Sequence, residues 1–339
     1  MKPQKILLAK PRGFCAGVER AIGVVDMALE LYGAPVYVRK EIVHNKHVIE
    51  SLAAKGAVFV EELSEVPEGA VVIFSAHGIA PLVRTEAAAK RLNVIDATCP
   101  LVTKVHLEAI RYANEGRSII LVGHEGHDEI IGTMGEVPEH IQLVGSVEEA
   151  EKVQVTDPER VALTTQTTLG VDDTREIIDV LKRRFPKLAT PPSDDICYAT
   201  QNRQEAVKLL ARQAGLVLVI GSDNSSNSRR LREVAEIWGA RAYLIEDASK
   251  IDPTWLENVD CVAITAGASA PEHLVGEVVE YFRRLGVEQV EEIEAIEERV
   301  TFLPPPELAK EMARRGISAE IVQDSSRIQA SVSDKPSLR

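Results

Sequence analysis

The sequence predicts an α/β protein made of three pseudo-equivalent α/β domains with mostly parallel sheets. Short aliphatic runs alternate with amphipathic stretches along most of the 339 residues, which is the pattern of strands and helices in parallel α/β folds. Three cysteines, Cys15, Cys99 and Cys197, are spread at comparable intervals through the chain. A chain of this length usually divides, because single cores stop growing beyond ~250–300 residues.

The first third begins with a strand that leads into the sequence PRGFCAG and then into a helix. Its later strands end in polar loops, one at His44 and one at SAHG, which contains His77. The expected elements are strands at 6–9, 36–38, 58–60 and 71–74, a helix at 18–31 and a helix ending near residue 55.

Two polar loops recur at similar offsets from each of the three cysteines. One lies 28 or 29 residues beyond the cysteine and the other lies 62 to 72 residues beyond it. The residues at these offsets are His44, His127 and Ser226 for the nearer loop, and His77, Thr167 and Ser269 for the farther loop. This layout predicts an internal repeat.

The repeat predicts domains at residues 1–96, 97–193 and 194–300, followed by a C-terminal extension at 301–339. The extension has three consecutive prolines and then a helix expected over 307–315. From about Asp324 it is polar and without apolar periodicity, so we expect that end to be disordered. No clear strand precedes Cys197, where residues 188–195 are proline-rich and polar.

Composition excludes several classes of protein. The formal net charge is −13 and only 14 residues are aromatic, which argues against a nucleic-acid binder. No apolar run approaches the ~18 residues of a membrane helix, and the N-terminal apolar stretch is too short for a signal peptide. We therefore expect a cytoplasmic protein with reduced thiols and no membrane partner.

Cys15, Cys99 and Cys197 each come just before a predicted helix, whose N-terminus stabilises a thiolate. Their equivalent placement favours a shared soft metal centre, although three buried core cysteines are the alternative. Structural zinc normally uses paired cysteines, which this chain lacks. An iron–sulfur cubane held by three cysteines would leave one iron open. Cys261 lies among aliphatic residues and is interpreted as a core residue.

The polar loops have the composition of an anion site. GSDNSSNS at 221–228, TTQTT at 164–168 and TAGAS at 265–269 offer hydroxyl, amide and backbone N–H donors before helices. Ordinary helix capping is the alternative for any one of them. Together with the loop histidines they predict a phosphate or diphosphate pocket, and the nucleotide fingerprints GxGxxG and GxxxxGK[ST] are absent.

The loop GHEGHDE at 123–129 places three carboxylates beside two histidines. A glutamate near a desolvated metal centre can have a raised pKa and donate a proton. Spacing alone does not decide which of Glu125, Asp128 and Glu129 would donate the proton. The alternative is that this loop is simply charged and solvated.

These motifs together resemble the 4-hydroxy-3-methylbut-2-enyl diphosphate reductase family, the last enzymes of the non-mevalonate isoprenoid pathway. The resemblance extends to about residue 300, and it implies three α/β domains around a central iron–sulfur cluster. The motifs that carry it are PRGFCAGVERAI, VHN, SAHG, DATCPLVTKVH, GHEGHDEIIGTMGE, TQTTLGVDDT, DDICYATQNRQEAV, GSDNSSNSRRL and TAGASAP.

The resemblance also implies roles for individual residues. Cys15, Cys99 and Cys197 would hold one [4Fe–4S] cluster whose fourth iron is open, and Glu129 would deliver a proton. The substrate diphosphate would be bound by His44, His77, His127, Thr167, Ser225, Ser226, Asn227 and Ser269. Thr168 and Asn224 would assist, His124 is not carried over, and Gly170 departs from the small polar residue often found there.

The implied reaction is the two-electron reductive dehydroxylation of an allylic alcohol diphosphate to isopentenyl diphosphate and dimethylallyl diphosphate. No flavin or NAD fingerprint is present, so a ferredoxin or flavodoxin would supply the electrons to what we expect is a monomer. Two alternatives stay open: a non-catalytic iron–sulfur or zinc module that acts as a sensor, and a hydro-lyase with an open-iron cluster and no net electron transfer.

Overall fold

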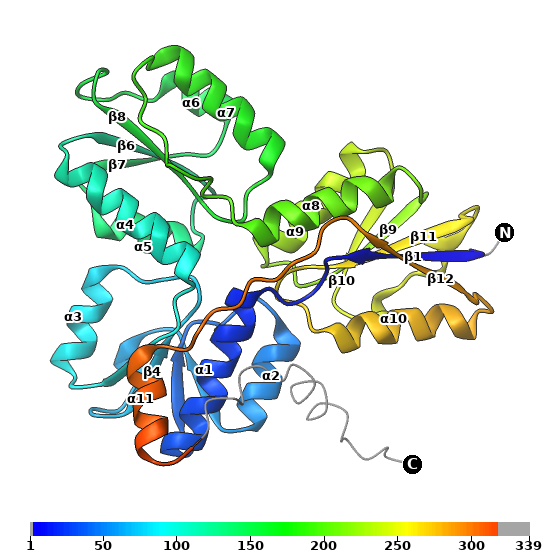
Figure 1. Ribbon diagram of the computed structural model, residues 1–339, viewed down its shortest axis with the longest axis horizontal. Helices are drawn as coiled ribbons and strands as arrows, with labels where there is room; N and C mark the ends of the chain where they lie inside the picture. The colour runs from blue at the N-terminus through cyan, green and yellow to red at the C-terminus, as the bar shows by residue number, and fades with distance from the viewer. Residues whose placement is uncertain (1–2, 318–339) are drawn as a thin grey trace. The chain divides into compact units, whose positions relative to one another are not determined.

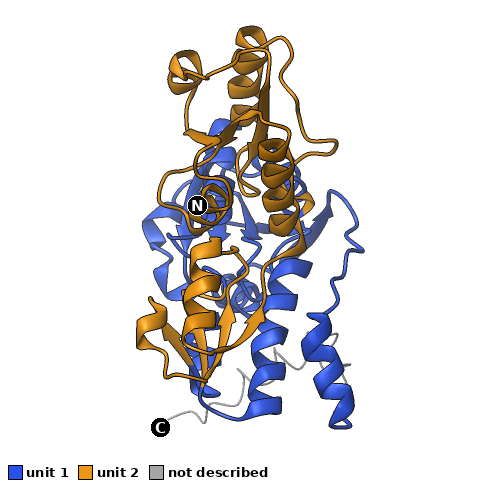
Figure 2. Cartoon of the chain, turned by 90° about the vertical axis from the view of Figure 1, so that its left-hand side faces the viewer, with its two compact units in different colours: residues 1–35, 43–57, 199–339 blue, residues 36–42, 58–198 orange. Residues whose placement is uncertain are grey.

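The computed structural model describes residues 3–317 of the chain. Their contacts divide them into two compact units (Figure 2). Unit 1 takes residues 1–35, 43–57 and 199–339 of the chain, and unit 2 takes residues 36–42 and 58–198. Within the described part, three sheets have parallel pairing, which confirms the predicted α/β class. The predicted domain boundaries at 1–96, 97–193 and 194–300 stay predictions.

Unit 1 is built on a five-stranded parallel sheet. Its strand order is β10 (Arg241–Ile245), β9 (Leu216–Ile220), β11 (Cys261–Ala266), β1 (Lys5–Lys10) and β12 (Gln289–Glu294) (Figure 1). The first strand of the chain therefore pairs on both sides with strands from its last third, with Leu7 opposite Ala263 and Glu291. This arrangement places the residues that follow β1 at the same sheet edge as those that follow β11.

Helices cover both faces of the unit 1 sheet. Strand side chains alternate, so that Ile6 packs with Val278 and Phe282 of α10 on one face, whereas Leu7 packs with Val207 and Leu231 of α8 and α9 on the other. The helices of unit 1 are α1 (Ala16–Tyr32), α2 (Lys46–Ala54), α8 (Tyr198–Ala211), α9 (Ser226–Ile237), α10 (Glu272–Arg284) and α11 (Pro306–Arg314).

Unit 2 contains the other two sheets. One has the order β3 (Ala57–Val60), β2 (Val36–Arg39), β4 (Val71–Phe74), β5 (Asn93–Asp96), and the other has the order β7 (Ile141–Val144), β6 (Ser118–Val122), β8 (Val161–Thr165). Their helices are α3 (Pro81–Ala89), α4 (Pro100–Asn114), α5 (Asp128–Glu136), α6 (Val147–Lys152) and α7 (Val171–Arg184).

Two connections in unit 1 have distinctive local structure. Helix α9 begins at Ser226, inside the polar run at 221–228, because the Ser225 side chain accepts a hydrogen bond from the Ser228 N–H and caps the helix there. The connection from β10 to β11 consists of the 3-10 turns Ala248–Lys250 and Pro253–Leu256 and contains no α-helix.

The C-terminal extension contains the predicted helix, now α11, which packs on α1. Arg315, just after α11, donates a hydrogen bond to the Leu31 carbonyl at 2.6 Å. The end expected to be disordered, from about Asp324, lies outside the described residues. None of the helices in residues 3–317 is long and apolar enough to cross a membrane.

Candidate functional site

In unit 2, Glu129 lies in the first turn of α5, and only 2% of its surface is exposed. The Thr167 backbone N–H donates to its Oε1 at 2.7 Å, and the Thr167 hydroxyl donates to its Oε2 at 3.0 Å. Both carboxylate oxygens are therefore held by one residue from the loop after β8. The fixed geometry suits a group that must present a proton in one direction.

Burial raises the pKa of Glu129 to about 7. The two hydrogen bonds from Thr167 oppose this rise, and the negative charge of Asp195 adds to it. A carboxyl with a pKa near neutrality is partly protonated under ordinary conditions, so Glu129 meets the requirement for a general acid.

Two predicted histidines also lie in unit 2. His127 caps α5, since its Nδ1 accepts the Glu129 N–H at 3.2 Å, and this leaves the Nε2 of a neutral ring as the protonated donor. The His77 ring lies edge-on to His127, with centroids 5.9 Å apart, and its Nδ1 is 3.3 Å from the Ser75 hydroxyl. The structure therefore brings His77, His127 and Glu129 together.

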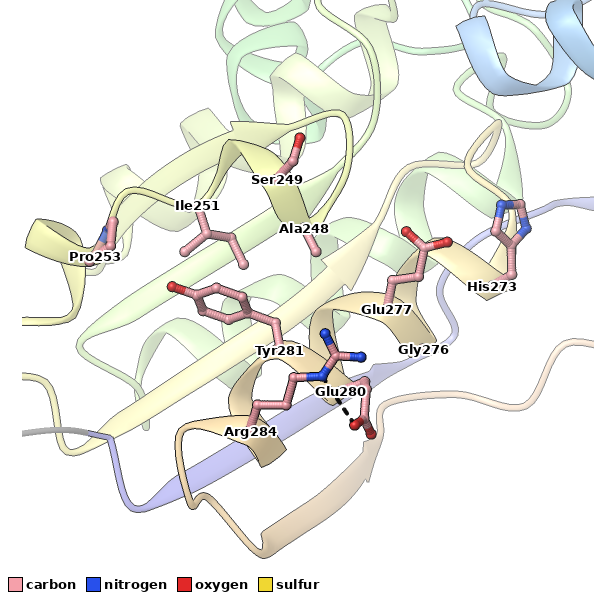
Figure 3. Close-up of a pocket in the computed structure, with 10 residues that line it drawn as sticks. All are labelled: Ala248, Ser249, Ile251, Pro253, His273, Gly276, Glu277, Glu280, Tyr281 and Arg284. Atoms are coloured by element: carbon pink, nitrogen blue, oxygen red, sulfur yellow. Dashed lines mark ion pairs between the residues drawn. The ribbon is translucent and has the colours of Figure 1, made fainter. Parts of the chain in front are cut away.

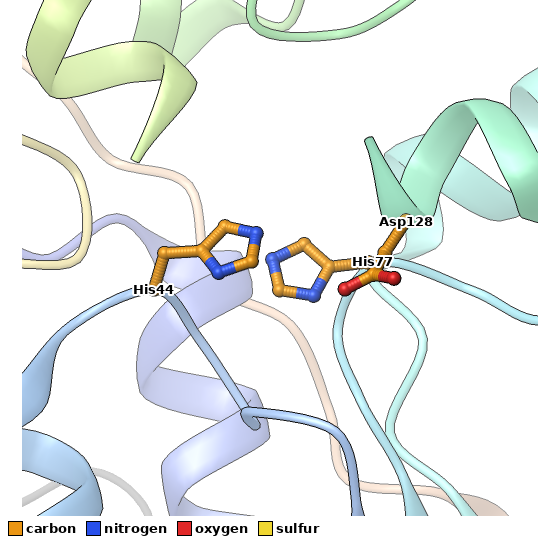
Figure 4. Close-up of side chains that lie close together, drawn as sticks. All are labelled: His44, His77 and Asp128. Atoms are coloured by element: carbon orange, nitrogen blue, oxygen red, sulfur yellow. The ribbon is translucent and has the colours of Figure 1, made fainter. Parts of the chain in front are cut away.

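Asp128 is a neighbour that sequence reasoning did not select. One ligand atom of His77 and one carboxylate oxygen of Asp128 lie within 4.8 Å of each other. Figure 4 shows the Asp128 carboxylate beside the His77 ring. Asp128 also lies 3.6 Å from the Lys40 ammonium, so its charge is partly balanced. Of the three carboxylates in the loop, Glu129 is the one that is buried and bound to Thr167.

Gln166 is a second residue that the sequence patterns did not identify. It is fully buried, its Oε1 accepts the His124 N–H at 3.0 Å, and its Nε2 donates to the Thr168 hydroxyl at 2.9 Å. Gln166 thus ties the loop after β6 to the loop after β8. The sequence feature that could have identified Gln166 is its position inside TTQTT, between the end of the strand and Thr167.

Backbone hydrogen bonds attach two of the predicted cysteines to these loops. The Cys99 N–H donates to the Ala76 carbonyl at 3.0 Å, next to His77. The Cys197 N–H donates to the Thr167 carbonyl at 3.0 Å. Both cysteines are partly exposed, and both directly precede a helix, α4 and α8 respectively. The structure therefore places one cysteine beside the His77 loop and one beside the Thr167 loop.

In unit 1, Cys15 has the equivalent position as the N-cap residue of α1. Its N–H donates to the Ala268 carbonyl at 3.2 Å, one residue before Ser269. Burial raises the pKa of the Cys15 thiol, whereas the charge of Arg203 and the N–H groups of Val18 and Gly17 lower it. Metal binding deprotonates a coordinating thiol even when its pKa is raised.

Arg203 supports the Cys15 loop from α8. It is completely buried and donates to the Gly13 carbonyl at 2.8 and 3.1 Å and to the Phe14 carbonyl at 3.3 Å. Glu298 balances the guanidinium charge at 3.0 Å. The loop that carries Cys15 is therefore held by side-chain donors as well as by the sheet.

Ser225, Ser226 and Asn227 lie at the N-terminus of α9, and all three are buried. Asn227 Oδ1 accepts the Ala268 N–H at 2.9 Å, and this bond joins the loop after β9 to the loop after β11. Gly221 and Gly267 allow both loops to pack closely against Ser228, because a Cβ on either glycine would lie within 2.3 Å of the Ser228 hydroxyl. The result is a set of neutral donors at a helix N-terminus, where anions bind favourably.

Ser269 and His44 are also brought together within unit 1. The Ser269 hydroxyl donates to the His44 carbonyl at 2.9 Å. Asn45 follows His44 and caps α2 by accepting the Val48 N–H. The predicted substrate residues of unit 1 therefore lie in loops that are hydrogen-bonded to one another.

A pocket of about 750 Å³ lies along α10 in unit 1, where the 3-10 turns replace a helix (Figure 3). Tyr281, Ile251 and His273 line it, and Glu280 pairs with Arg284 at 3.5 Å. None of the predicted site residues lines this pocket.

Cys261 is only partly buried and begins β11 rather than lying in its middle. It packs against the core beneath α8 and α9, and burial raises the pKa of its thiol. Unlike the other three cysteines it does not precede a helix. The interpretation as a packing residue is consistent with this position.

The chemistry of these cysteines suits an iron–sulfur protein. Cys15, Cys99 and Cys197 each lie at a helix start, where backbone N–H groups favour the thiolate. Soft thiolate ligands select zinc or iron–sulfur clusters, and a closed structural zinc site would need a fourth ligand.

Parallel sheets with a buried carboxyl, loop histidines and helix-start cysteines at their strand ends define an α/β enzyme scaffold with residues suited to metal binding. Comparison with known proteins agrees with this class. The model of the LytB protein family matches residues 6–283, and the chain belongs to this family. Members of the LytB family are iron–sulfur proteins.

Two relatives and one solved structure that match the chain are named as reductases of allylic diphosphates. A 4-hydroxy-3-methylbut-2-enyl diphosphate reductase from Streptomyces avermitilis is 58% identical over 321 residues, 94% of each chain. One from Acidothermus cellulolyticus is 60% identical over 314 residues, 92% of each chain. The solved E-1-hydroxy-2-methyl-but-2-enyl-4-diphosphate reductase from Plasmodium falciparum has a TM-score of 0.88 and 38% identity, and it covers 93% of this chain and 99% of its own.

Proposed function

We propose that the chain reduces 4-hydroxy-3-methylbut-2-enyl diphosphate to isopentenyl diphosphate and dimethylallyl diphosphate, the last step of the non-mevalonate isoprenoid pathway. The reaction takes two electrons and two protons. The allylic C–O bond breaks, the hydroxyl leaves as water with one proton, and the second proton forms a C–H bond at either end of the allyl group. Family membership and the high identity of the named reductases support this function.

Cys15, Cys99 and Cys197 hold one [4Fe–4S] cluster and leave its fourth iron without a protein ligand. When bound, the cluster supplies the electrons and a Lewis-acidic iron. The equivalent positions of the three cysteines at the starts of α1, α4 and α8 support this assignment. Cys261 is not a ligand, which agrees with its place in β11.

Glu129 delivers a proton to the leaving hydroxyl. Its burial and its raised pKa favour a protonated carboxyl that can act as a general acid. Thr167 fixes both carboxylate oxygens, so that the proton is held in one orientation. Exclusion of water around this buried group also limits stray protonation of the allyl fragment.

The substrate diphosphate is bound by neutral donors. The Nε2–H of His127 and the N-terminus of α9 support such binding, because both present N–H groups without a lysine charge. The proposed set is His44, His77, His127, Thr167, Ser225, Ser226, Asn227 and Ser269.

Electrons come from a small external protein of the ferredoxin or flavodoxin type, since no flavin or NAD fingerprint is present in the chain. The chain works as a monomer in the cytoplasm, where the thiols stay reduced until they bind iron.

The observation that carries the proposal is the connection Glu129–Thr167–Cys197, in which Thr167 is hydrogen-bonded both to a buried acid and to the backbone of a proposed cluster ligand. The test is anaerobic incubation of the purified protein with 4-hydroxy-3-methylbut-2-enyl diphosphate and an artificial reductant. We expect the two isoprenyl diphosphates to form only when reductant is present. Conversion without reductant would identify a hydro-lyase instead, and no conversion by iron-loaded protein would favour a sensor.

A further inference from the structure

The segment that leads to Cys197 differs from the segment that leads to Cys99. Strand β5 runs almost to Cys99, and Asp96 at its end accepts hydrogen bonds from the Thr98 N–H and hydroxyl at 2.9 and 2.5 Å. Residues 190–197 contain no strand, although they run beside β8, the edge strand of its sheet. The position of Cys197 must therefore be fixed by contacts other than those of a strand directly before it.

The first part of this segment pairs with β8 as a strand would. The Ala189 N–H donates to the Val161 carbonyl at 3.0 Å, and the Leu163 N–H donates to the Ala189 carbonyl at 2.8 Å. Continued parallel pairing would require residue 191 to donate to Leu163. Residue 191 is proline and has no N–H, so the ladder stops there.

The Asp195 side chain then replaces the missing strand. Its Oδ2 accepts the Thr165 N–H at 3.0 Å and the Thr164 hydroxyl at 2.9 Å, and its side chain is 0% exposed. Two residues later the Cys197 N–H reaches the Thr167 carbonyl. The Asp195 carboxylate therefore accepts the hydrogen bond of the Thr165 N–H. A backbone carbonyl would do so in a continued strand, but the proline-containing segment does not offer one there.

Lys104 of α4 completes the arrangement from the other side. Its ammonium donates to Asp195 Oδ1 at 3.0 Å and to the carbonyls of Ser193 and Asp194 at 2.8 and 3.0 Å. An ammonium has three protons, and all three serve this segment. Cys99 is the N-cap residue of α4, the helix that carries Lys104. Lys104 therefore connects the helix that follows Cys99 to the loop that precedes Cys197.

We propose that Asp195 and Lys104 form a positioning pair that fixes the Cys197 loop against β8 and α4. The role of the pair is to hold one sulfur where a cluster needs it. The proposal rests on the proposed function to the extent that Cys197 is a cluster ligand.

The test compares Asp195→Asn, Lys104→Met and the double variant with the parental protein, each purified anaerobically with its iron. Asp194→Asn is the matched control, because Asp194 is adjacent and exposed. The first measurement is the rate of iron loss to a chelator. The second is the initial rate of alkylation at each cysteine, resolved by mass spectrometry.

Loss of a hydrogen-bonded charge pair should speed iron loss and the alkylation of Cys197 about tenfold in each single variant. Alkylation of Cys99 and Cys15 should initially stay at the parental rate, whereas a general loss of structure would expose all three cysteines together. The double variant should resemble the singles because the two residues act as a unit. Asp194→Asn should match the parental protein.

Parental rates in folded Asp195→Asn and Lys104→Met would overturn the positioning pair. If either single variant fails to fold because it leaves the charge of Asp195 or of Lys104 unpaired, the double variant, which removes both of these charges, decides by the same two measurements. Absence of iron from the parental protein would instead refute the proposed function, so the two failures are distinguishable.

Discussion

The strand-end loops of the two units carry chemically different groups. In unit 2 the strand-end loops carry buried ionisable groups, with Glu129 bound to Thr167 and Asp195 paired with Lys104. In unit 1 the loops at Ser225–Asn227 and Ser269 offer hydroxyl and amide groups, which do not titrate in the ordinary range. We therefore expect proton transfer to depend on unit 2, whereas the hydroxyl and amide donors of unit 1 should bind an anion in the same way across the ordinary pH range.

The largest expected effect comes from removing the acid of unit 2. Glu129→Gln keeps the shape of the side chain but cannot donate the carboxyl proton, so turnover should fall by about 10²–10⁴-fold. Iron content and substrate KM should change little. Steady-state kinetics with an artificial reductant, together with iron analysis, would check this, and near-parental turnover would refute the assignment.

The pH dependence of the parental enzyme sharpens the same point. Glu129 has a pKa of about 7 and must be protonated to act, so kcat should fall as the pH rises through that value. The fall should disappear from the residual activity of Glu129→Gln. A parental kcat that is constant from about pH 6 to about pH 9 would contradict a general acid with this pKa.

A smaller effect is expected from the neutral donors of unit 1. Asn227→Asp is isosteric but places a negative charge beside the proposed diphosphate site, so KM should rise about tenfold. The pH at which kcat falls should stay where it is in the parental enzyme. If KM for the diphosphate substrate is unchanged, Asn227 does not bind it.

The smallest effect concerns stability in unit 2. Burial raises the pKa of Glu108 to about 7, and the neighbouring Asp195 adds to the rise. Between pH 4.5 and about 7 the folded protein keeps a proton that the unfolded chain releases, so the free energy of unfolding falls as pH rises through this window. Glu108→Gln should flatten that slope.

Denaturant unfolding at several pH values would measure this difference, with Glu139→Gln at an exposed position of the same unit as the control. The control should keep the parental slope. A Glu108→Gln variant with an unchanged slope would mean that Glu108 is ionised in the folded protein.

Much of the architecture was predictable because the signals were local. Aliphatic runs such as Leu216–Ile220 become buried strands, and the helices after Cys15, Cys99 and Cys197 form where periodicity places them. The pairing of β1 with β11 and β12 was not predictable, since strand order depends on contacts between residues far apart in the sequence.

The site residues also divide into those that the sequence predicts and those that it does not. Cys197, Thr167 and Glu129 could be selected by residue type, position and family resemblance. Gln166, Asp195 and Lys104 could not, because their roles depend on which loops the fold brings together. The start of α9 at Ser226 was not predictable either. It depends on a cap from Ser225, and several other polar residues in GSDNSSNS could cap a helix equally well.

The most direct test of the account is the iron and inorganic sulfide content of anaerobically purified protein, compared across four single Cys→Ser variants. We expect equal iron and sulfide in the parental protein and in Cys261→Ser, and loss of both in Cys15→Ser, Cys99→Ser and Cys197→Ser. Zinc in the parental protein, or loss of iron from folded Cys261→Ser, would contradict the three-cysteine cluster.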